Sequence, residues 1–196
     1  MKDFHKNISF SNLKILNLKL IIILKFNILI KKLTSFLFLT TLTLNLSISQ
    51  DKIPFMNIKT IEGRTINTKS LSNKDGLTVY SFWATWCVPC INELDDINKE
   101  IEKWKEENVK IIAISTDDSR TKRRVRPMIN GKDWDFEIFV DENQDFKRAL
   151  NITGIPHTIV AKGSKIIYRR IGYKPGEENI LYEFILSQNK NSNEKI

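Results

Sequence analysis

Apolar residues recur with two different periods after residue 50, and these periods predict alternating strands and helices. The largely apolar runs Leu77 to Trp83 and Val109 to Ser115 each predict a buried strand. Between them, apolar residues recur at intervals of three and four and predict one helix from about Cys87 to Glu107. The residues of this stripe are Ile91, Leu94, Ile97, Ile101 and Trp104. A strand, a helix and a strand in this order predict a right-handed parallel crossover.

The rest of the chain continues this alternation. A polar stretch from Thr116 to Ser119 offers N-cap residues for a helix that reaches Met128. The pattern then predicts a strand, a short helix, a hairpin and a final helix, at Phe136 to Val140, Asn143 to Leu150, Thr158 to Ile171 and Glu177 to Ser187. Helices that alternate with the strands of a mixed sheet make the expected fold class α/β.

A second hairpin is expected before the first buried strand. Phe55 to Ile61 alternates loosely between apolar and polar residues and meets Glu62-Gly63-Arg64, after which Thr65 to Thr68 is again typical of a strand. We expect this hairpin to add strands to an edge of the sheet.

Residues 1–49 differ in composition from the rest and are excluded from the fold prediction. They carry seven lysines and one acidic residue, and an uncharged stretch from Leu33 to Ser49 follows Lys31-Lys32. With the small-x-small site Ser47-Ile48-Ser49, this pattern predicts a cleaved secretory signal. An uncleaved membrane anchor is the alternative, since the stretch has 17 residues and a spanning helix needs about 17 to 25. Both interpretations place a single domain, residues 50–190, outside the cytoplasm, followed by a flexible tail at 191–196.

The charge of the chain gives no support for nucleic-acid binding. The formal net charge is +8 for the whole sequence, but from Gln50 onward 24 Lys and Arg stand against 22 Asp and Glu. A nearly neutral domain lacks the basic footprint that nucleic acids require. One local basic cluster, Arg120, Lys122, Arg123, Arg124 and Arg126, is interpreted as a solvated helix face, with docking of an acidic partner as the alternative.

The two cysteines of the chain are the strongest indication of its chemistry. Cys87 and Cys90 lie between the first buried strand and the following helix. This spacing puts the first sulfur at a helix N-terminus, where free N–H groups and the helix dipole favour the reactive thiolate. A purely structural disulfide is the alternative, but closing so short a loop stabilises the fold little. We therefore interpret the pair as a redox dithiol.

The residues around this pair resemble the thioredoxin superfamily. The resemblance rests on the segment Phe82-Trp83-Ala84-Thr85-Trp86-Cys87-Val88-Pro89-Cys90 and on Gly154-Ile155-Pro156 further along the chain. With Glu93 three residues after the second cysteine, the chain is similar to the extracytoplasmic TlpA/ResA group. The resemblance implies a thioredoxin-like fold, a central mixed sheet flanked by helices, with the first hairpin as an N-terminal extension.

The resemblance also implies roles for individual residues. Cys87 is the expected nucleophile, Cys90 the resolving cysteine, and Pro156 the cis-proline that faces them. Ile155 is expected to offer its backbone to an extended substrate. Trp83 and Trp86 are expected to shield the disulfide, and Trp86 to contact substrate. Neither a metal nor a cofactor other than the redox disulfide is expected.

Three positions near the site need separate interpretation. Glu93 is expected to tune the thiols or transfer a proton, because Ser81 stands where many thioredoxins have a buried Asp; a solvated helix acid is the alternative. Asp95 stands where thioredoxins have a helix-kinking proline, so we expect a straighter helix. His157, after Pro156, is interpreted as a strand-surface histidine rather than a group that senses the thiolate.

The function that these features predict is extracytoplasmic reduction of protein disulfides. The resemblance implies protein thiol and disulfide substrates, in cytochrome c maturation or metal-centre assembly, and a membrane electron donor. A peroxiredoxin-like peroxidase is an alternative on the same fold, although no Pro-x-x-x-Thr-x-x-Cys pattern precedes either cysteine. A copper-binding module of the Sco kind is the non-enzymatic alternative, although it needs three residues between its cysteines. A structural zinc site needs four ligands, and only His157 accompanies the two cysteines in the domain.

Overall fold

The computed structural model describes residues 22–35 and 52–193. The chain divides into two units, residues 1–49 and 50–196. In the first unit, residues 22–35 form a helix with exposed side chains. Within the described ranges no helix is both long enough and apolar enough to cross a membrane. The predicted Ser47-Ile48-Ser49 site and most of the uncharged stretch before it lie outside the described residues.

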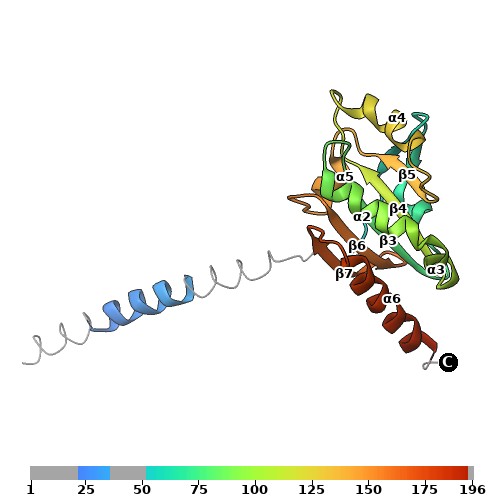
Figure 1. Cartoon of the computed structure of the whole chain (residues 1–196). Coiled ribbons are helices and arrows are strands. Elements are labelled where there is room, and N and C mark those ends of the chain that lie inside the picture. Colours follow the sequence, from blue (N-terminus) through green and yellow to red (C-terminus); the bar gives the residue numbers. More distant parts are fainter. Residues whose placement is uncertain (1–21, 36–51, 194–196) are drawn as a thin grey trace, which may run out of the picture. The chain divides into compact units, whose positions relative to one another are not determined.

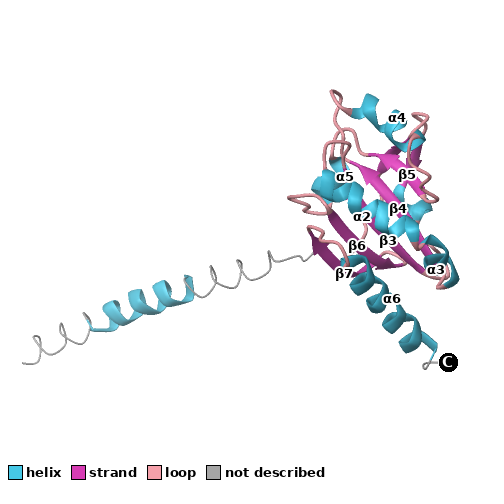
Figure 2. Cartoon of the chain, viewed as in Figure 1, coloured by secondary structure: helices cyan, strands magenta, loops and turns pink. Residues whose placement is uncertain are grey.

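The second unit is built around a mixed sheet. Its strands are β1 (Asn57–Thr60), β2 (Thr65–Asn67), β3 (Leu77–Trp83), β4 (Val109–Ser115), β5 (Glu137–Val140), β6 (His157–Lys162) and β7 (Lys165–Ile171). Its helical elements are η1 (Thr68–Leu71), α2 (Val88–Lys99), α3 (Ile101–Glu106), η2 (Lys122–Arg124), α4 (Val125–Asn130), α5 (Asp145–Ala149) and α6 (Glu177–Asn193). The strand order is β2-β1-β5-β4-β3-β6-β7 (Figures 1 and 2).

Strand directions confirm the predicted α/β fold. β3, β4 and β5 are parallel to one another, whereas β6 runs antiparallel to β3, and β7 to β6. The β1–β2 hairpin joins the edge of the sheet at β5, as predicted, and β6–β7 forms the other predicted hairpin. The carboxyl ends of the three parallel strands therefore lie at one edge of the sheet.

Alternate side chains of β3 face two different cores, because successive side chains of a strand point to opposite faces. Val79 packs with Ile97 of α2 and with residues of α3 and α6. Tyr80 and Phe82 lie on the other face, where the ring of Phe146 in α5 contacts them at centroid distances of 6.3 and 5.5 Å. Helices thus cover both faces of the sheet (Figure 2), which explains why β3 is buried throughout.

The prediction of one helix from Cys87 to Glu107 is wrong. The backbone leaves helical geometry at Glu100, with φ −112° and ψ 19°, so that α2 and α3 are separate helices. Neither proline nor glycine marks this position. The break accompanies tertiary packing: Trp104 of α3 is buried, and its ring meets that of Tyr182 in α6 edge-on at 5.2 Å.

Two other helix predictions need correction. Thr116 to Ser119 does not cap a helix, since η2 begins only at Lys122 and α4 covers Val125–Asn130. The last helix, α6, runs past Ser187 to Asn193 and takes in residues 191–193 of the predicted tail.

α2 continues through Asp95 without interruption. The carboxylate of Asp95 accepts hydrogen bonds from Trp134 Nε1 at 2.8 Å and from Lys132 Nζ at 2.5 Å. The residue that replaces the helix-kinking proline therefore fastens α2 to the segment before β5.

Candidate active site

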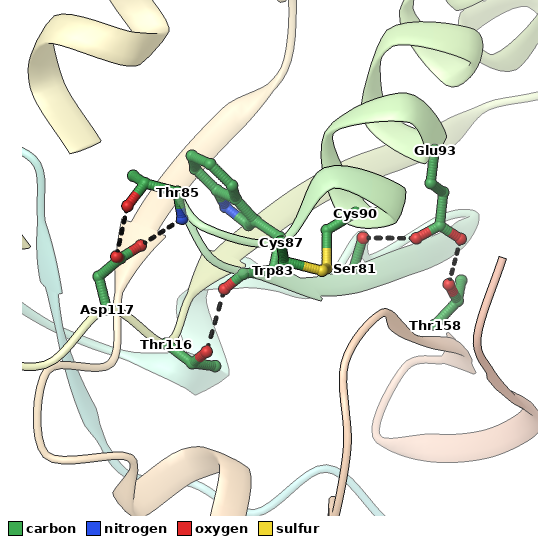
Figure 3. The surroundings of a disulfide bond; sticks show 9 residues. All are labelled: Ser81, Trp83, Thr85, Cys87, Cys90, Glu93, Thr116, Asp117 and Thr158. Atoms are coloured by element: carbon green, nitrogen blue, oxygen red, sulfur yellow. Dashed lines mark hydrogen bonds between the residues drawn. A yellow bond between two sulfur atoms is a disulfide. The ribbon is translucent and has the colours of Figure 1, made fainter. Parts of the chain in front are cut away.

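The two cysteines lie at the first turn of α2, directly beyond the carboxyl end of β3. They form a disulfide, and Cys87 is the N-cap residue of the helix (Figure 3). The side chain of the N-cap residue makes no hydrogen bond to the free N–H groups of this turn. In the reduced protein these groups are therefore free to stabilise a thiolate at Cys87.

Access distinguishes the two sulfurs. Cys87 keeps 5% of its surface exposed, whereas Cys90 keeps none. Beside Cys87, Trp86 and Val88 are 59% and 66% exposed. Cys87 is thus the cysteine that an approaching disulfide can reach, and two exposed apolar side chains flank it. Trp83, in contrast, is fully buried in the same apolar cluster as both cysteines, whereas Trp86 remains exposed beside Cys87.

The loop before β6 approaches the disulfide from the other side of the site. Ile155 packs against the apolar cluster that contains Cys87 and Cys90. The Ile155–Pro156 peptide bond is cis, the conformation that the family resemblance implies. Pro156 accepts a backbone hydrogen bond from Gly172 at 2.8 Å. Within residues 52–193 neither backbone group of Ile155 has a hydrogen-bond partner, so both are available to an extended segment.

Glu93 is a fully buried carboxylate rather than a solvated helix acid, so that alternative is wrong. Its oxygens accept hydrogen bonds from Ser81 in β3 at 3.2 Å and from Thr158 in β6 at 2.5 Å (Figure 3). A third donor, Nη2 of Arg170 in β7, lies at 2.6 Å. The hydroxyl of Ser81, where many thioredoxins carry an acid, here contacts the acid of α2.

Burial dominates the electrostatics of this carboxyl. Loss of hydration raises the pKa of Glu93, while the hydroxyl of Thr158, the charge of Arg170 and the hydroxyl of Ser81 act in the opposite direction. A carboxyl with a raised pKa retains its proton at pH values where an exposed Glu has lost it. The shift thus moves the pKa of Glu93 toward the ordinary pKa of a thiol.

Arg170 is a residue of the site that the sequence did not indicate. Its Nη1 donates to the carbonyl of Glu177 at 2.7 Å, and its guanidinium lies 5.6 Å from the ring centroid of Tyr173. The Tyr173 hydroxyl in turn donates to Asp96 of α2 at 2.6 Å. Glu177 and Tyr173 thus hold Arg170 where it meets Glu93, 77 positions away in the sequence, and no local pattern predicts such a contact.

Asp117 is a second buried acid that the sequence analysis misassigned, as an N-cap. Its carboxylate accepts the Thr85 N–H at 2.9 Å, the Thr85 hydroxyl at 2.7 Å and the Ser115 hydroxyl at 2.8 Å (Figure 3). Next to it, Thr116 donates its hydroxyl to the carbonyl of Trp83 at 3.1 Å. The loop after β4 therefore fastens the loop that carries the cysteines.

The interpretation of His157 as a surface histidine is wrong. It begins β6, which lies between β3 and β7, and only 4% of its surface is exposed. It is paired with Phe82 of β3, so its side chain faces the core beneath α5. Burial, followed by the positive charge of Arg169, lowers the pKa of His157 to about 4. Within the described part of the chain neither ring nitrogen has a hydrogen-bond partner.

Comparison with known proteins gives one family and several similar proteins. Residues 49–170 match the model of the AhpC/TSA family. Thiol-disulfide oxidoreductase ResA of Bacillus thuringiensis is 29% identical over 126 residues, which are 64% of this chain and 70% of ResA. Sporulation thiol-disulfide oxidoreductase A of Bacillus subtilis is 29% identical over 50% of this chain and 59% of its own length. A solved thioredoxin-like protein of Porphyromonas gingivalis is 35% identical, with a TM-score of 0.63 over 72% of this chain and 94% of that protein.

The buried His157 predicts acid sensitivity of the fold. Its folded-state pKa of about 4 lies below the ordinary 6.5, so between these pH values only the unfolded chain binds the proton. This contribution to stability is complete above pH 6.5 and is lost as the pH falls toward 4, with a slope of about 1.4 kcal/mol per pH unit. In His157→Leu this dependence should be absent.

Urea unfolding of the oxidised protein at several pH values measures the effect. Above pH 6.5 the free energies of unfolding of the original protein and the variant should differ by a constant amount. Below pH 6.5 this difference should change with pH. An unchanged difference from pH 7 to 4 would contradict the assignment.

Proposed function

The chain belongs to the AhpC/TSA family, and on this basis we propose that it is a thiol-disulfide oxidoreductase that reduces disulfides of other proteins outside the cytoplasm. One observation carries the proposal: Cys87 and Cys90 form a disulfide at the start of α2 in which only the first sulfur retains exposed surface. The similarity to ResA and to the sporulation oxidoreductase supports the same chemistry.

In the proposed first step the Cys87 thiolate attacks one sulfur of the substrate disulfide. A Cys87–substrate bond forms, the substrate S–S bond breaks, and the other substrate sulfur leaves with the bonding electron pair as a thiolate. Exposed Trp86 and Val88 provide apolar contact area, and the free backbone groups of Ile155 provide strand-like hydrogen bonds to the substrate.

In the second step Cys90 resolves the mixed disulfide. Its thiol loses a proton and attacks Cys87, which re-forms the Cys87–Cys90 bond and releases the second substrate thiolate; two electrons have then moved from the dithiol to the substrate. The two cysteines lie in one helical turn, with Cα atoms 5.3 Å apart, so this step is intramolecular and fast. We assign Glu93 the role of accepting the Cys90 proton, because both residues are buried on the same helix three positions apart.

The direction and place of the reaction are part of the proposal. The basic leader and uncharged stretch of residues 1–49 support export, either with cleavage or as an anchor. Outside the cytoplasm the oxidised protein requires a dithiol donor of lower potential, which we propose to be a membrane protein. Cytochrome c maturation and metal-centre assembly are the processes that need such a reductant.

Replacement of Cys90 by Ala should trap the substrate. Without the resolving sulfur, the Cys87–substrate disulfide cannot be released intramolecularly and should accumulate. Non-reducing electrophoresis and mass spectrometry of the trapped species identify the partner. The Cys87→Ala/Cys90→Ala variant is the control, and absence of any adduct with Cys87 accessible would contradict a protein substrate.

A reductase should have a low reduction potential. We expect equilibration with glutathione or dithiothreitol to give a value for Cys87–Cys90 nearer that of thioredoxin, about −270 mV, than that of the strong oxidant DsbA, about −120 mV. A value close to −120 mV would instead make the protein an oxidant.

Glu93→Gln separates the two chemical steps. Reaction of the reduced protein with Ellman's reagent releases one chromophore when Cys87 attacks and a second when Cys90 resolves. If Glu93 accepts the Cys90 proton, the second phase should slow at least about tenfold, whereas the first phase should change little. Glu102→Gln, at an exposed position of α3, is the matched control. Equal rates of the second phase in Glu93→Gln and the control would refute the assignment.

A further inference from the structure

A groove of about 460 Å³ lies between the β1–β2 turn and the segment formed by η2 and α4. Figure 1 shows α4 above the β5 side of the sheet. The charged residues that line the groove are Lys59, Glu62, Lys122, Arg123, Arg126 and Glu142. Four cations and two acids thus face the same space.

The acids of this groove offset only part of its positive charge. Glu142 accepts from Lys122 at 2.7 Å and also lies 3.9 Å from Lys59, so one carboxylate serves two ammonium groups. The other acid, Glu62, pairs with Arg64, an arginine outside the groove. Arg123 and the adjacent Arg124 are exposed, and neither forms an ion pair with any residue of 52–193. The surface therefore presents free guanidinium groups, which bind carboxylates in a bidentate manner.

The groove and the reactive sulfur lie at the same edge of the sheet. Cys87 follows the carboxyl end of β3, the basic segment follows that of β4, and Glu142 follows that of β5. Val125, between the exposed arginines and Arg126, is buried in the apolar cluster that contains both cysteines. The bonds of Asp117 to Thr85 join the same two loops. A protein that brings its disulfide to Cys87 therefore approaches the surface that carries these cations.

We propose that this basic groove binds an acidic segment of the protein whose disulfide Cys87 reduces. The inference rests on the proposed function and adds that the substrate protein carries a negatively charged segment. The domain as a whole is nearly neutral, so the preference arises from this local surface and not from net charge. Docking here orients the substrate and raises the rate of encounter, while the chemistry at Cys87 is unchanged.

Model peptides test the substrate charge. The reduced full chain, in nonionic detergent, is mixed with peptides that contain one disulfide. Each peptide also carries a flanking segment of four Asp, four Ser or four Lys residues. Acid quench and alkylation then give the second-order rate at which each peptide oxidises the Cys87–Cys90 dithiol. At low ionic strength the Asp peptide should react about tenfold faster than the Ser peptide, and the advantage should shrink at high salt.

A pair of charge-reversed variants locates the effect. Arg123→Glu/Arg124→Glu should abolish or invert the preference for the Asp peptide while leaving the rate with the Ser peptide unchanged. The control is Lys74→Glu/Lys165→Glu, which changes the net charge equally at exposed positions. These lysines lie at the amino end of β3, where Leu77 pairs with Lys162 and Lys162 with Lys165. The control variant should keep the preference.

The outcomes separate the two proposals. No reaction of the original protein with the Ser peptide would refute the proposed function. If the original protein reacts with the Ser peptide, either of two results would overturn the basic groove as a docking site. In one, both charge-reversed variants lose the preference for the Asp peptide equally; in the other, neither variant loses it. Suppression of the preference by millimolar inorganic phosphate at constant ionic strength would also overturn it, since the groove would then be a site for a small anion.

Discussion

The architecture of the redox site depends on the hydrogen bonds of the buried Glu93 carboxylate. It lies on α2 and accepts hydrogen bonds from β3, β6 and β7, so one side chain joins four elements beside the cysteines. Removing one partner of a buried ion pair typically costs about 3 to 5 kcal/mol, because a charge then remains without compensation. The position of α2 against the sheet is therefore set by polar contacts of high cost as well as by apolar packing. The position of α2 in turn sets the geometry of the Cys87–Cys90 pair at its first turn.

The other side of the site is fixed by different means. Asp117 fastens the loop after β4 to Thr85, and Ile155 closes the site from the loop before β6. Three strand ends thus contribute to the surroundings of Cys87, while its neighbours Trp86 and Val88 remain exposed. A rigid frame with an accessible apolar rim suits the proposed reaction with disulfides of other proteins.

Local patterns predicted the parts of this structure that depend on neighbours in sequence. Strand runs, hairpins and the placement of Cys87 and Cys90 at a strand–helix junction follow from periodicity and spacing. The parts that were wrong or missing depend on the third dimension. The helix break at Glu100 accompanies packing of α3 against α6, His157 is buried because β6 is an inner strand, and Arg170 meets its partner across 77 positions. No pattern within a short stretch of the sequence predicts these three features.

The small span of the Cys87–Cys90 ring has a thermodynamic consequence. A link confined to the first turn of α2 restricts the unfolded chain little, so loop entropy contributes little to any difference in stability between the oxidised and reduced forms. Folding and reduction form a closed thermodynamic cycle. Each 30 mV by which the reduction potential of the folded protein differs from that of the unfolded chain therefore equals about 1.4 kcal/mol of difference in stability between the oxidised and reduced forms. The redox preference of the protein therefore arises from contacts of the two sulfurs in the folded state and little from loop entropy.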